Sequence, residues 1–270
     1  MTSLAAWIGI DSRGASSFYL VSDSRINWGQ GLTWDYGRKL FASQIYPDIF
    51  GYCGDVLFPS LILGQAVSLM DCGSLFSHLE NPSDRFKKLS NLIMKSFGDL
   101  PSCVQNPFTI LYCSRLNESL KSTFELYRLD WSHKNGWKTS QPELPSYSDL
   151  VLSLGSGKES ILASHLNWQK TEVKGTSRSV FSAFCDSLES GQDPLSGGAP
   201  QLVGIYRKGA ARSFGIVFND QKYLLGLPVE NENLKSVEWR NHLFEVSDPN
   251  TNQRQTNAQP QPRPKSLRKY

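Results

Sequence analysis

The sequence has 270 residues, of which 39% are hydrophobic and 20% are charged, and its formal net charge is +3. These values describe a globular protein with a substantial core, in one large domain or two small ones. The positive charge is concentrated after residue 246, where five Lys or Arg accompany one acidic residue. The rest of the chain is nearly neutral, which argues against a nucleic-acid-binding surface.

No segment reaches the roughly 18 apolar residues that cross a membrane, and the first residues lack the basic and long apolar regions of a signal peptide. We therefore expect a cytoplasmic protein without membrane contact. The cysteines are odd in number without CxxC spacing, and the histidines form no HExxH pair, so we expect reduced thiols, no metal site and no cofactor. These residues are Cys53, Cys72, Cys103, Cys113, Cys185, His78, His133, His165 and His242.

The first part of the chain predicts two pairs of strands. A hairpin is expected over residues 3–23, with its turn at residues 12–16. A polar, Gly-rich loop at residues 27–37 separates it from the second pair. The four predicted strands are residues 4–10, 18–22, 39–43 and 48–53.

Helices and further strands follow. Residues 57–70 have helical length, with Pro59 in the first turn. Residues 83–97 repeat apolar side chains at helical spacing, and Ser83 is the expected N-cap. The remaining predicted elements are strands at 108–113, 123–129 and 150–154, a helix at 177–188, and strands at 202–206, 214–218 and 223–227.

This order places blocks of strands between pairs of helices, which predicts two stacked sheets with helices outside. We assign residues 1–246 to this domain. Residues 247–270 are rich in Pro, Gln and Asn and show no apolar periodicity, so we expect a disordered basic tail. Such a tail either keeps the protein soluble or docks a partner.

Thr2 is the first candidate for chemistry. A threonine hydroxyl is a poor nucleophile until a base takes its proton, and the chain has no GxSxG elbow. Removal of Met1, which aminopeptidases perform when the second residue is small, would make Thr2 its own base. Its α-amine has an ordinary pKa near 7.7–8.0, and a neighbouring lysine would lower it further.

Several polar residues and glycines lie at ends of strands or in Gly-rich turns, where such a site would form. Asp23 and Arg25 follow the second strand, Lys39 begins the third, and Gly54 ends the fourth just before a helix. Backbone N–H groups at such a junction can stabilise an oxyanion. Later candidates are Ser156, between two glycines, and Asp193 and Ser196, in a Gly-rich turn.

Together these motifs resemble those of the proteasome β-subunits and their bacterial relatives, the N-terminal nucleophile hydrolases. The likeness runs from Thr2 to about Phe218, with six motifs in the family's order. They are Thr2, Asp23-Ser24-Arg25, the stretch at 37–41, Cys53-Gly54-Asp55, Gly155-Ser156-Gly157 and the stretch at 193–198. The resemblance implies an α+β fold, specifically a four-layer αββα sandwich.

The resemblance also implies roles for these residues. Thr2 would be nucleophile and base, Asp23 would orient Lys39, and Gly54 would stabilise the oxyanion. The reaction would pass through an acyl ester on Thr2, which water cleaves. Ser156, Asp193 and Ser196 would bind around the α-amine, and Arg25, Tyr52 and Cys53 would contact substrate, with Tyr52 and Cys53 making the pocket atypical.

Each motif alone has a plain structural explanation. Asp23 can cap a turn, Lys39 can be a solvated strand end, and the glycine-serine stretches can be ordinary turns. The ordered co-occurrence of all six favours a site. For the aromatic residues Trp28, Trp34 and Tyr36, packing in a core or between subunits competes with substrate contact.

We therefore expect a threonine-type peptidase that acts on peptides or unfolded proteins, assembles into a homo-oligomeric ring and has an ATP-dependent unfoldase as a candidate partner. Two alternatives remain open. One is a hydrolase of small amides on the same fold. The other is a proteasome-like scaffold or sensor without catalysis, which applies if Met1 is retained.

Overall fold

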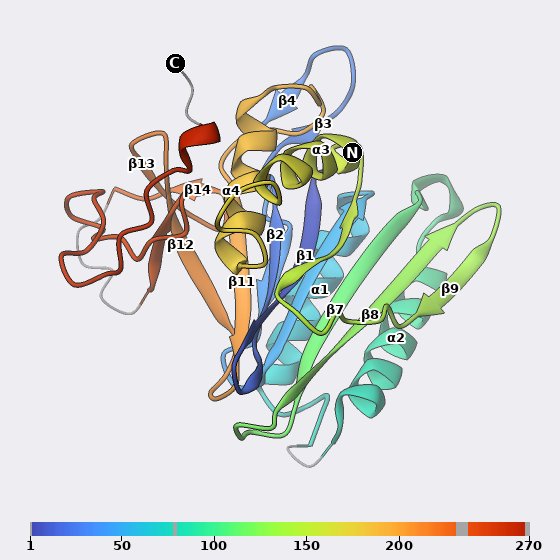
Figure 1. The fold of residues 1–270 in the computed structure, drawn as a ribbon. Helices are drawn as coiled ribbons and strands as arrows, with labels where there is room; N and C mark the ends of the chain where they lie inside the picture. Colours follow the sequence, from blue (N-terminus) through green and yellow to red (C-terminus); the bar gives the residue numbers. More distant parts are fainter. Residues whose placement is uncertain (1, 78–79, 231–236, 268–270) are drawn as a thin grey trace.

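The computed structural model describes residues 2–77, 80–230 and 237–267, and over these ranges the fold mixes helices with mainly antiparallel sheets (Figure 1). One sheet of the described chain has eight strands, in the order β10-β1-β2-β11-β12-β13-β14, with β15 beside β12. Within it, only the described β12–β15 pair is parallel. The bounds are β1 Leu4–Asp11, β2 Gly14–Ser22, β10 Asp149–Leu154, β11 Gln201–Tyr206, β12 Arg212–Phe218, β13 Gln221–Leu224, β14 Leu227–Pro228 and β15 Trp239–Asn241.

A second sheet has five antiparallel strands among the described residues, in the order β5-β6-β7-β8-β9, so β5 and β9 form its edges. A separate two-stranded ribbon joins β3 to β4. The bounds are β3 Ile26–Asn27, β4 Thr33–Trp34, β5 Leu40–Ala42, β6 Asp48–Gly54, β7 Phe108–Leu116, β8 Thr123–Ser132 and β9 Gly136–Ser140.

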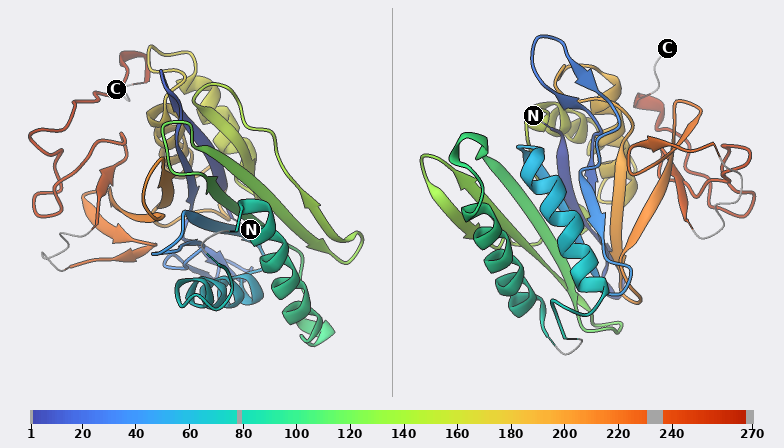
Figure 2. Two further views of the ribbon diagram at one scale, coloured as in Figure 1. Left: turned by 90° about the horizontal axis from the view of Figure 1, so that it is seen from below. Right: turned by 180° about the vertical axis from the view of Figure 1, so that it is seen from behind.

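The helices lie outside the two sheets. Helices α3 and α4 lie beside β1, β2 and β11, whereas α1 and α2 lie on the far side, behind the five-stranded sheet (Figures 1 and 2). The helices are α1 Leu57–Asp71, α2 Pro82–Gly98, α3 Lys158–Trp168 and α4 Ser177–Glu189, and the short 3-10 turns are Ser102–Val104 and Lys265–Leu267.

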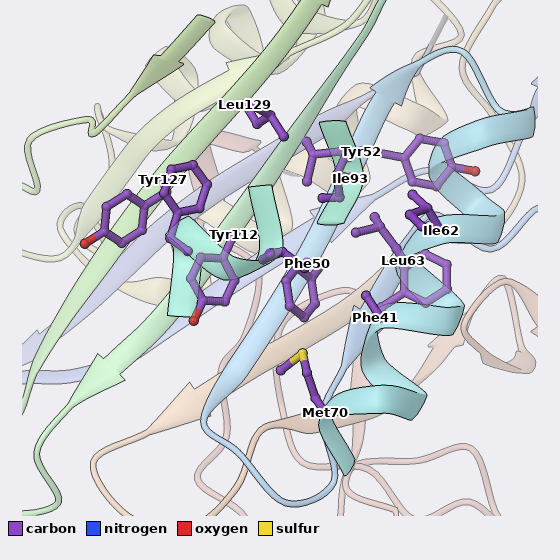
Figure 3. Close-up of a cluster of buried hydrophobic side chains, with 14 of the residues drawn as sticks. Phe41, Phe50, Tyr52, Ile62, Leu63, Met70, Ile93, Tyr112, Tyr127 and Leu129 are labelled. Carbon is purple, nitrogen blue, oxygen red and sulfur yellow. The ribbon is translucent and has the colours of Figure 1, made fainter. Parts of the chain in front are cut away.

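The hydrophobic core divides into three clusters that match this arrangement. One lies between the five-stranded sheet and α1 and α2, a second lies between the two sheets, and a third lies between the eight-stranded sheet and α4. Figure 3 shows part of the first cluster, with strand residues facing the helix α1. The labelled strand side chains include Phe50, Tyr52 and Tyr112, and those of α1 are Ile62, Leu63 and Met70.

Side chains of strand β6 alternate between its two faces and therefore contribute to two core clusters. Ile49 and Cys53 face the other sheet, and Phe50 and Tyr52 face the helices. A Cβ at Gly51 would lie 3.0 Å from the Leu4 side chain of the other sheet, so glycine lets the sheets approach here.

Several predicted elements are confirmed. The first hairpin forms, although its strands extend to residue 11 and back to residue 14, leaving a shorter turn than expected. Pro59 lies in the first turn of α1, where its missing N–H costs little. The coarse expectation of a mixed fold with two sheets and outer helices also agrees with the described residues.

Other predictions were wrong or incomplete. Ser83 lies inside α2, whose N-cap is Asn81: the Asn81 side chain accepts a hydrogen bond from Asp84 N at 2.9 Å. Helix α3 was not among the predicted helices. Its apolar residues do not recur on one face of the helix, so the sequence shows no amphipathic pattern there. The short strands β3, β4 and β9 fell within loops or unassigned sequence.

The segment after residue 246 has little regular structure among its described residues. Its end contacts the outer helices: Arg263 forms an ion pair with Asp186 of α4 and lies 5.6 Å from the ring centre of Trp168 in α3. Residues 268–270 lie outside the described residues. The domain boundary and the disorder of the tail stay predictions.

Leu111 tests the core between the sheets. Its side chain is fully buried in the second cluster, so Leu111→Ala removes buried methyl groups and leaves a cavity. We expect the free energy of unfolding to fall by about 2–5 kcal/mol in urea denaturation. Leu120→Ala, at a leucine that is 55% exposed, should change it by less than about 0.5 kcal/mol. Equal losses would contradict this packing.

Candidate active site

A buried ion pair lies at the centre of the candidate site. Asp23 follows β2, Lys39 precedes β5, and both side chains have no exposed surface. Lys39 Nζ lies 2.7 Å from Asp23 Oδ1 and also donates to the Arg25 carbonyl oxygen at 2.6 Å. Because removing two charges from water costs several kcal/mol per ion, such a pair needs further hydrogen bonds to persist.

Backbone groups supply those hydrogen bonds to Asp23. Ser3 N–H donates to Oδ1 at 2.9 Å, and the N–H groups of Arg25 and Gly197 donate to Oδ2 at 3.1 and 3.0 Å. A single carboxylate therefore joins the start of β1, the turn after β2 and the loop before β11. The lysine side chain is held at the point where these three segments meet.

A second polar network surrounds the backbone nitrogen of Thr2. Thr2 N–H donates to Ser156 Oγ at 3.3 Å, and Ser156 Oγ donates to Asp193 Oδ2 at 2.8 Å. Ser196 Oγ donates to the same carboxylate oxygen at 2.7 Å, and Ser3 Oγ donates to Ser196 Oγ at 2.8 Å. Hydrogen bonds therefore connect Thr2 to Ser3 through Ser156, Asp193 and Ser196, which lie more than 150 residues later in the chain.

Gly155 fits tightly against Thr2. Its φ of +87° lies in the left-handed region that favours glycine, and a Cβ there would lie 1.8 Å from the Thr2 carbonyl oxygen. The turn that begins with this glycine leads into α3. The close approach thereby sets the position of Ser156 relative to Thr2.

Gly54 also requires glycine, for a different reason. Its φ is +98°, and a Cβ would lie 2.6 Å from the Pro107 carbonyl oxygen. Gly54 and Gly155 line one cavity of about 490 Å³. The structure therefore places Gly54 near the glycine that contacts Thr2, while the oxyanion role of its N–H stays a prediction.

The two residues before Gly54 point to opposite faces of β6. Cys53 lies in the core between the sheets and lines the same cavity as Gly54, and its burial raises the pKa of its thiol to about 11. Tyr52 lines a separate cavity of about 870 Å³ and donates its hydroxyl to the Arg38 carbonyl oxygen at 3.1 Å. Two substrate contacts predicted side by side thus belong to two cavities.

Arg25 is occupied by protein groups. Its Nε and Nη2 donate to Asp35 at 2.7 and 2.8 Å, which raises the pKa of the guanidinium, and Nη1 donates to the Pro194 carbonyl oxygen at 3.2 Å. These bonds tie the turn after β2 to the loop that carries Asp193. The predicted contact of Arg25 with substrate is untested, and its described contacts position these loops.

The aromatic residues of the predicted 27–37 loop lie on and around the ribbon β3–β4. Trp28 is 64% exposed and Trp34 is 46% exposed, and Trp34 also lines the 870 Å³ cavity. Trp34 and Tyr36 pack edge to face at 6.2 Å. These side chains are outside the core, so a contact with substrate or with another chain remains open to them.

Sequence reasoning missed Gln201. This fully buried residue donates through Nε2 to the carbonyl oxygens of Asp23 and Gly37, and its Oε1 accepts from Lys39 N at 3.1 Å. No local signal marks it, because its partners lie more than 160 residues earlier in the chain. It holds the two halves of the ion pair in register.

The described residues contain no group of three or more His, Cys, Asp or Glu placed to hold a metal ion. None of the helices in those ranges is both long and apolar enough to cross a membrane. Met1 and His78 lie outside the described residues.

No protein-family model matches the sequence, and no curated protein matches it. Among solved structures, the chain is similar to eukaryotic HslV from Trypanosoma brucei, with a TM-score of 0.47 and 11% sequence identity. The match covers 75% of this chain and 99% of that chain.

Gly155 provides a direct test of the contact with Thr2. Gly155→Ala introduces a Cβ against the Thr2 carbonyl oxygen at a positive φ, so we expect a loss of more than about 3 kcal/mol in the free energy of unfolding. Gly136→Ala is a matched control, because its φ is +60° and no atom lies within 4 Å of the added Cβ. It should cost about 1 kcal/mol in the same urea titration. Similar losses would contradict the close approach.

Proposed function

We propose that this chain is an N-terminal threonine hydrolase that cleaves peptide (amide) bonds through an acyl ester on Thr2. The observation that supports it most is the convergence of two networks on the start of β1. The buried Asp23–Lys39 pair reaches it through Ser3 N–H, and the Ser156–Asp193–Ser196 network reaches it through Thr2 N and Ser3 Oγ. A plain set of turns has no reason to bring these groups to two adjacent residues.

The proposed chemistry begins with a cut between Met1 and Thr2, which turns the Thr2 nitrogen into an amine. The amine takes the hydroxyl proton while the oxygen attacks the carbonyl carbon of the substrate. The positive charge of Lys39 keeps the amine in its free-base form by lowering its pKa. Asp23 positions that charge.

The tetrahedral intermediate carries a negative oxygen, for which the Gly54 N–H is the proposed donor. The protonated amine then gives its proton to the leaving nitrogen, and the acyl ester remains on Thr2. Water, deprotonated by the same amine, attacks the ester and releases the acid. Ser156 and Asp193 hold the amine in place through both steps.

The fold that fits this proposal is the four-layer αββα sandwich of proteasome-like hydrolases, with the layers α1–α2, the five-stranded sheet, the eight-stranded sheet and α3–α4. The 870 Å³ cavity is a candidate pocket for a large apolar side chain, because Phe41, Tyr52 and Trp34 line it. Peptide substrates therefore fit the proposal better than small polar amides.

Assembly and location are part of the proposal. Trp28, Leu32 and Leu61 are 58–64% exposed, and exposed apolar groups of this kind often mark contacts between chains. We propose a self-assembled ring with an ATP-dependent unfoldase as partner. The five free cysteines support a cytoplasmic location.

Two rival functions remain to be distinguished by experiment. A hydrolase of small amides would use the same Thr2 chemistry and would prefer simple amides to a peptide library. A scaffold without catalysis would keep Met1, because an acylated nitrogen cannot act as a base.

Intact mass spectrometry tests the first step. We expect the purified protein to lack the mass of Met1 and to gain one covalent adduct with an acylating probe. Thr2→Ala should form no adduct, and the exposed Thr123→Ala should react as the wild type does. Retained Met1, or an adduct that survives in Thr2→Ala, would rule out the proposed nucleophile.

Lys39 tests the role of the ion pair. Lys39→Ala should slow acylation by at least about 100-fold, the usual scale of assistance by a positioned proton-transfer system. Since that change strands a buried carboxylate, the double variant Lys39→Met with Asp23→Asn keeps the site neutral and should be equally slow while folded. Lys121→Ala, at an exposed lysine, serves as the control. Wild-type rates in the folded double variant would refute the role.

A further inference from the structure

A row of side chains runs across the five-stranded sheet from the candidate site to the edge. In the strand registers, Cys53 of β6 lies opposite Thr109 of β7, Thr109 opposite Asp130 of β8, and Asp130 opposite Lys138 of β9. Directly opposed residues project to the same face of a sheet. Because Cys53 faces the other sheet, all four side chains lie on that face of the five-stranded sheet, where Lys138, on the edge strand, is exposed.

One cavity contains this row. The 490 Å³ cavity is lined at one end by Cys53, Gly54 and Gly155, and along its length by Thr109, Asp130 and Lys138. Gly155 is the residue that packs against Thr2. The cavity that contains the lysine therefore lies beside Thr2, which is itself buried.

The charges in this cavity do not cancel. Asp130 is neutralised by Arg128, whose Nε and Nη2 approach its carboxylate to 2.8 Å, and it accepts a hydrogen bond from the Thr109 hydroxyl at 2.5 Å. The backbone of Lys138 pairs with β8, but its side chain forms no hydrogen bond or ion pair with the residues that the structure describes. The cavity wall is left with one uncompensated positive charge.

The strand spacing also gives the distance between the candidate site and Lys138. Neighbouring strands lie about 4.8 Å apart, so three spacings place the Lys138 backbone about 14 Å from that of Cys53. An extended peptide advances about 3.3 Å per residue, and a lysine side chain reaches back several ångströms. The charge is in reach of a group two or three residues from the bond that is cut.

The polarity of the path follows from the proton transfer. The leaving nitrogen takes its proton from the Thr2 amine, and Thr2 N is hydrogen-bonded to Ser156, next to Gly155. This bond favours a leaving segment on the Gly155 side. Gly155 lines this cavity and does not line the apolar cavity that contains Tyr52.

We propose that the 490 Å³ cavity binds the leaving segment of the substrate and that Lys138 selects a carboxylate two or three residues beyond the scissile bond. This inference rests on the proposed hydrolase function. The carboxylate is either an acidic side chain or the free C-terminus of a short peptide.

Peptides with one fixed acyl part and varied leaving segments test the proposal. With Glu in place of Gln two or three residues beyond the bond, kcat/KM should rise about threefold, the scale of one partly exposed charge pair. Lys138→Gln should abolish this preference, and Lys134→Gln, a charge-matched change outside the cavity lining, should keep it. High salt should weaken it in the wild type. A preference that is absent, or that persists in Lys138→Gln, overturns the proposal.

The same peptides with free or amidated C-termini identify the source of the carboxylate. A preference for the free terminus in neutral peptides assigns the chain end, and a preference for Glu in amidated peptides assigns the side chain; both support the proposal. Loss of discrimination in both series overturns it.

Binding separates failure of this inference from failure of the proposed function. Acidic and neutral leaving peptides are titrated into Thr2→Ala and into Thr2→Ala with Lys138→Gln by calorimetry. Tighter binding of the acidic peptide that depends on Lys138, without any hydrolysis by the wild type, supports the cavity and refutes the hydrolase. Hydrolysis without charge-dependent binding supports the hydrolase and refutes the role of the cavity. If neither hydrolysis nor charge-dependent binding is observed, both proposals are refuted.

Discussion

The buried pair of Asp23 and Lys39 is the interaction on which the candidate site depends. Two ions without exposed surface are stable only where hydrogen bonds replace lost water, and here backbone N–H groups from three segments do so. Those segments thereby become fixed relative to one another. The start of β1 is thereby held beside Lys39. Separating Lys39 from Asp23 would leave a buried charge unpaired, which costs several kcal/mol.

The site lies where the core between the sheets ends and polar groups replace apolar ones. Strand β6 separates two environments because its side chains alternate: Tyr52 faces the apolar cavity, and Cys53 faces the charged one. A reacting bond held beside Gly54 would have an apolar surface on one side and a positive charge on the other. The proposed selectivity follows from this division, which one strand creates.

Local signals accounted for much of the fold. The first hairpin and helices α1, α2 and α4 follow from β-prone runs, helical length or amphipathic spacing, and the structure contains all of them. Helix α3 was not predicted because its buried face mixes the polar Ser160 and His165 with Ile161 and Trp168, and an apolar residue, Leu166, is exposed. The N-cap of α2 was misplaced by two residues, since Asn81 and Ser83 are both good caps and only the backbone geometry chooses between them.

The sequence by itself determined which chemical groups are present and in what order, including the threonine at position 2, the acid and lysine on successive strand ends, and the serine and aspartate in Gly-rich turns. Only the tertiary structure decided which of them meet. Ser156 and Asp193 are joined through one hydrogen bond, and Gln201 reaches Lys39 from 162 residues away. In the tertiary structure, Tyr52 and Cys53 line different cavities, and Arg25 is hydrogen-bonded to Asp35. The physical reason is that strand pairing and sheet packing bring distant segments together, and a short stretch of sequence carries no record of the neighbour it will contact.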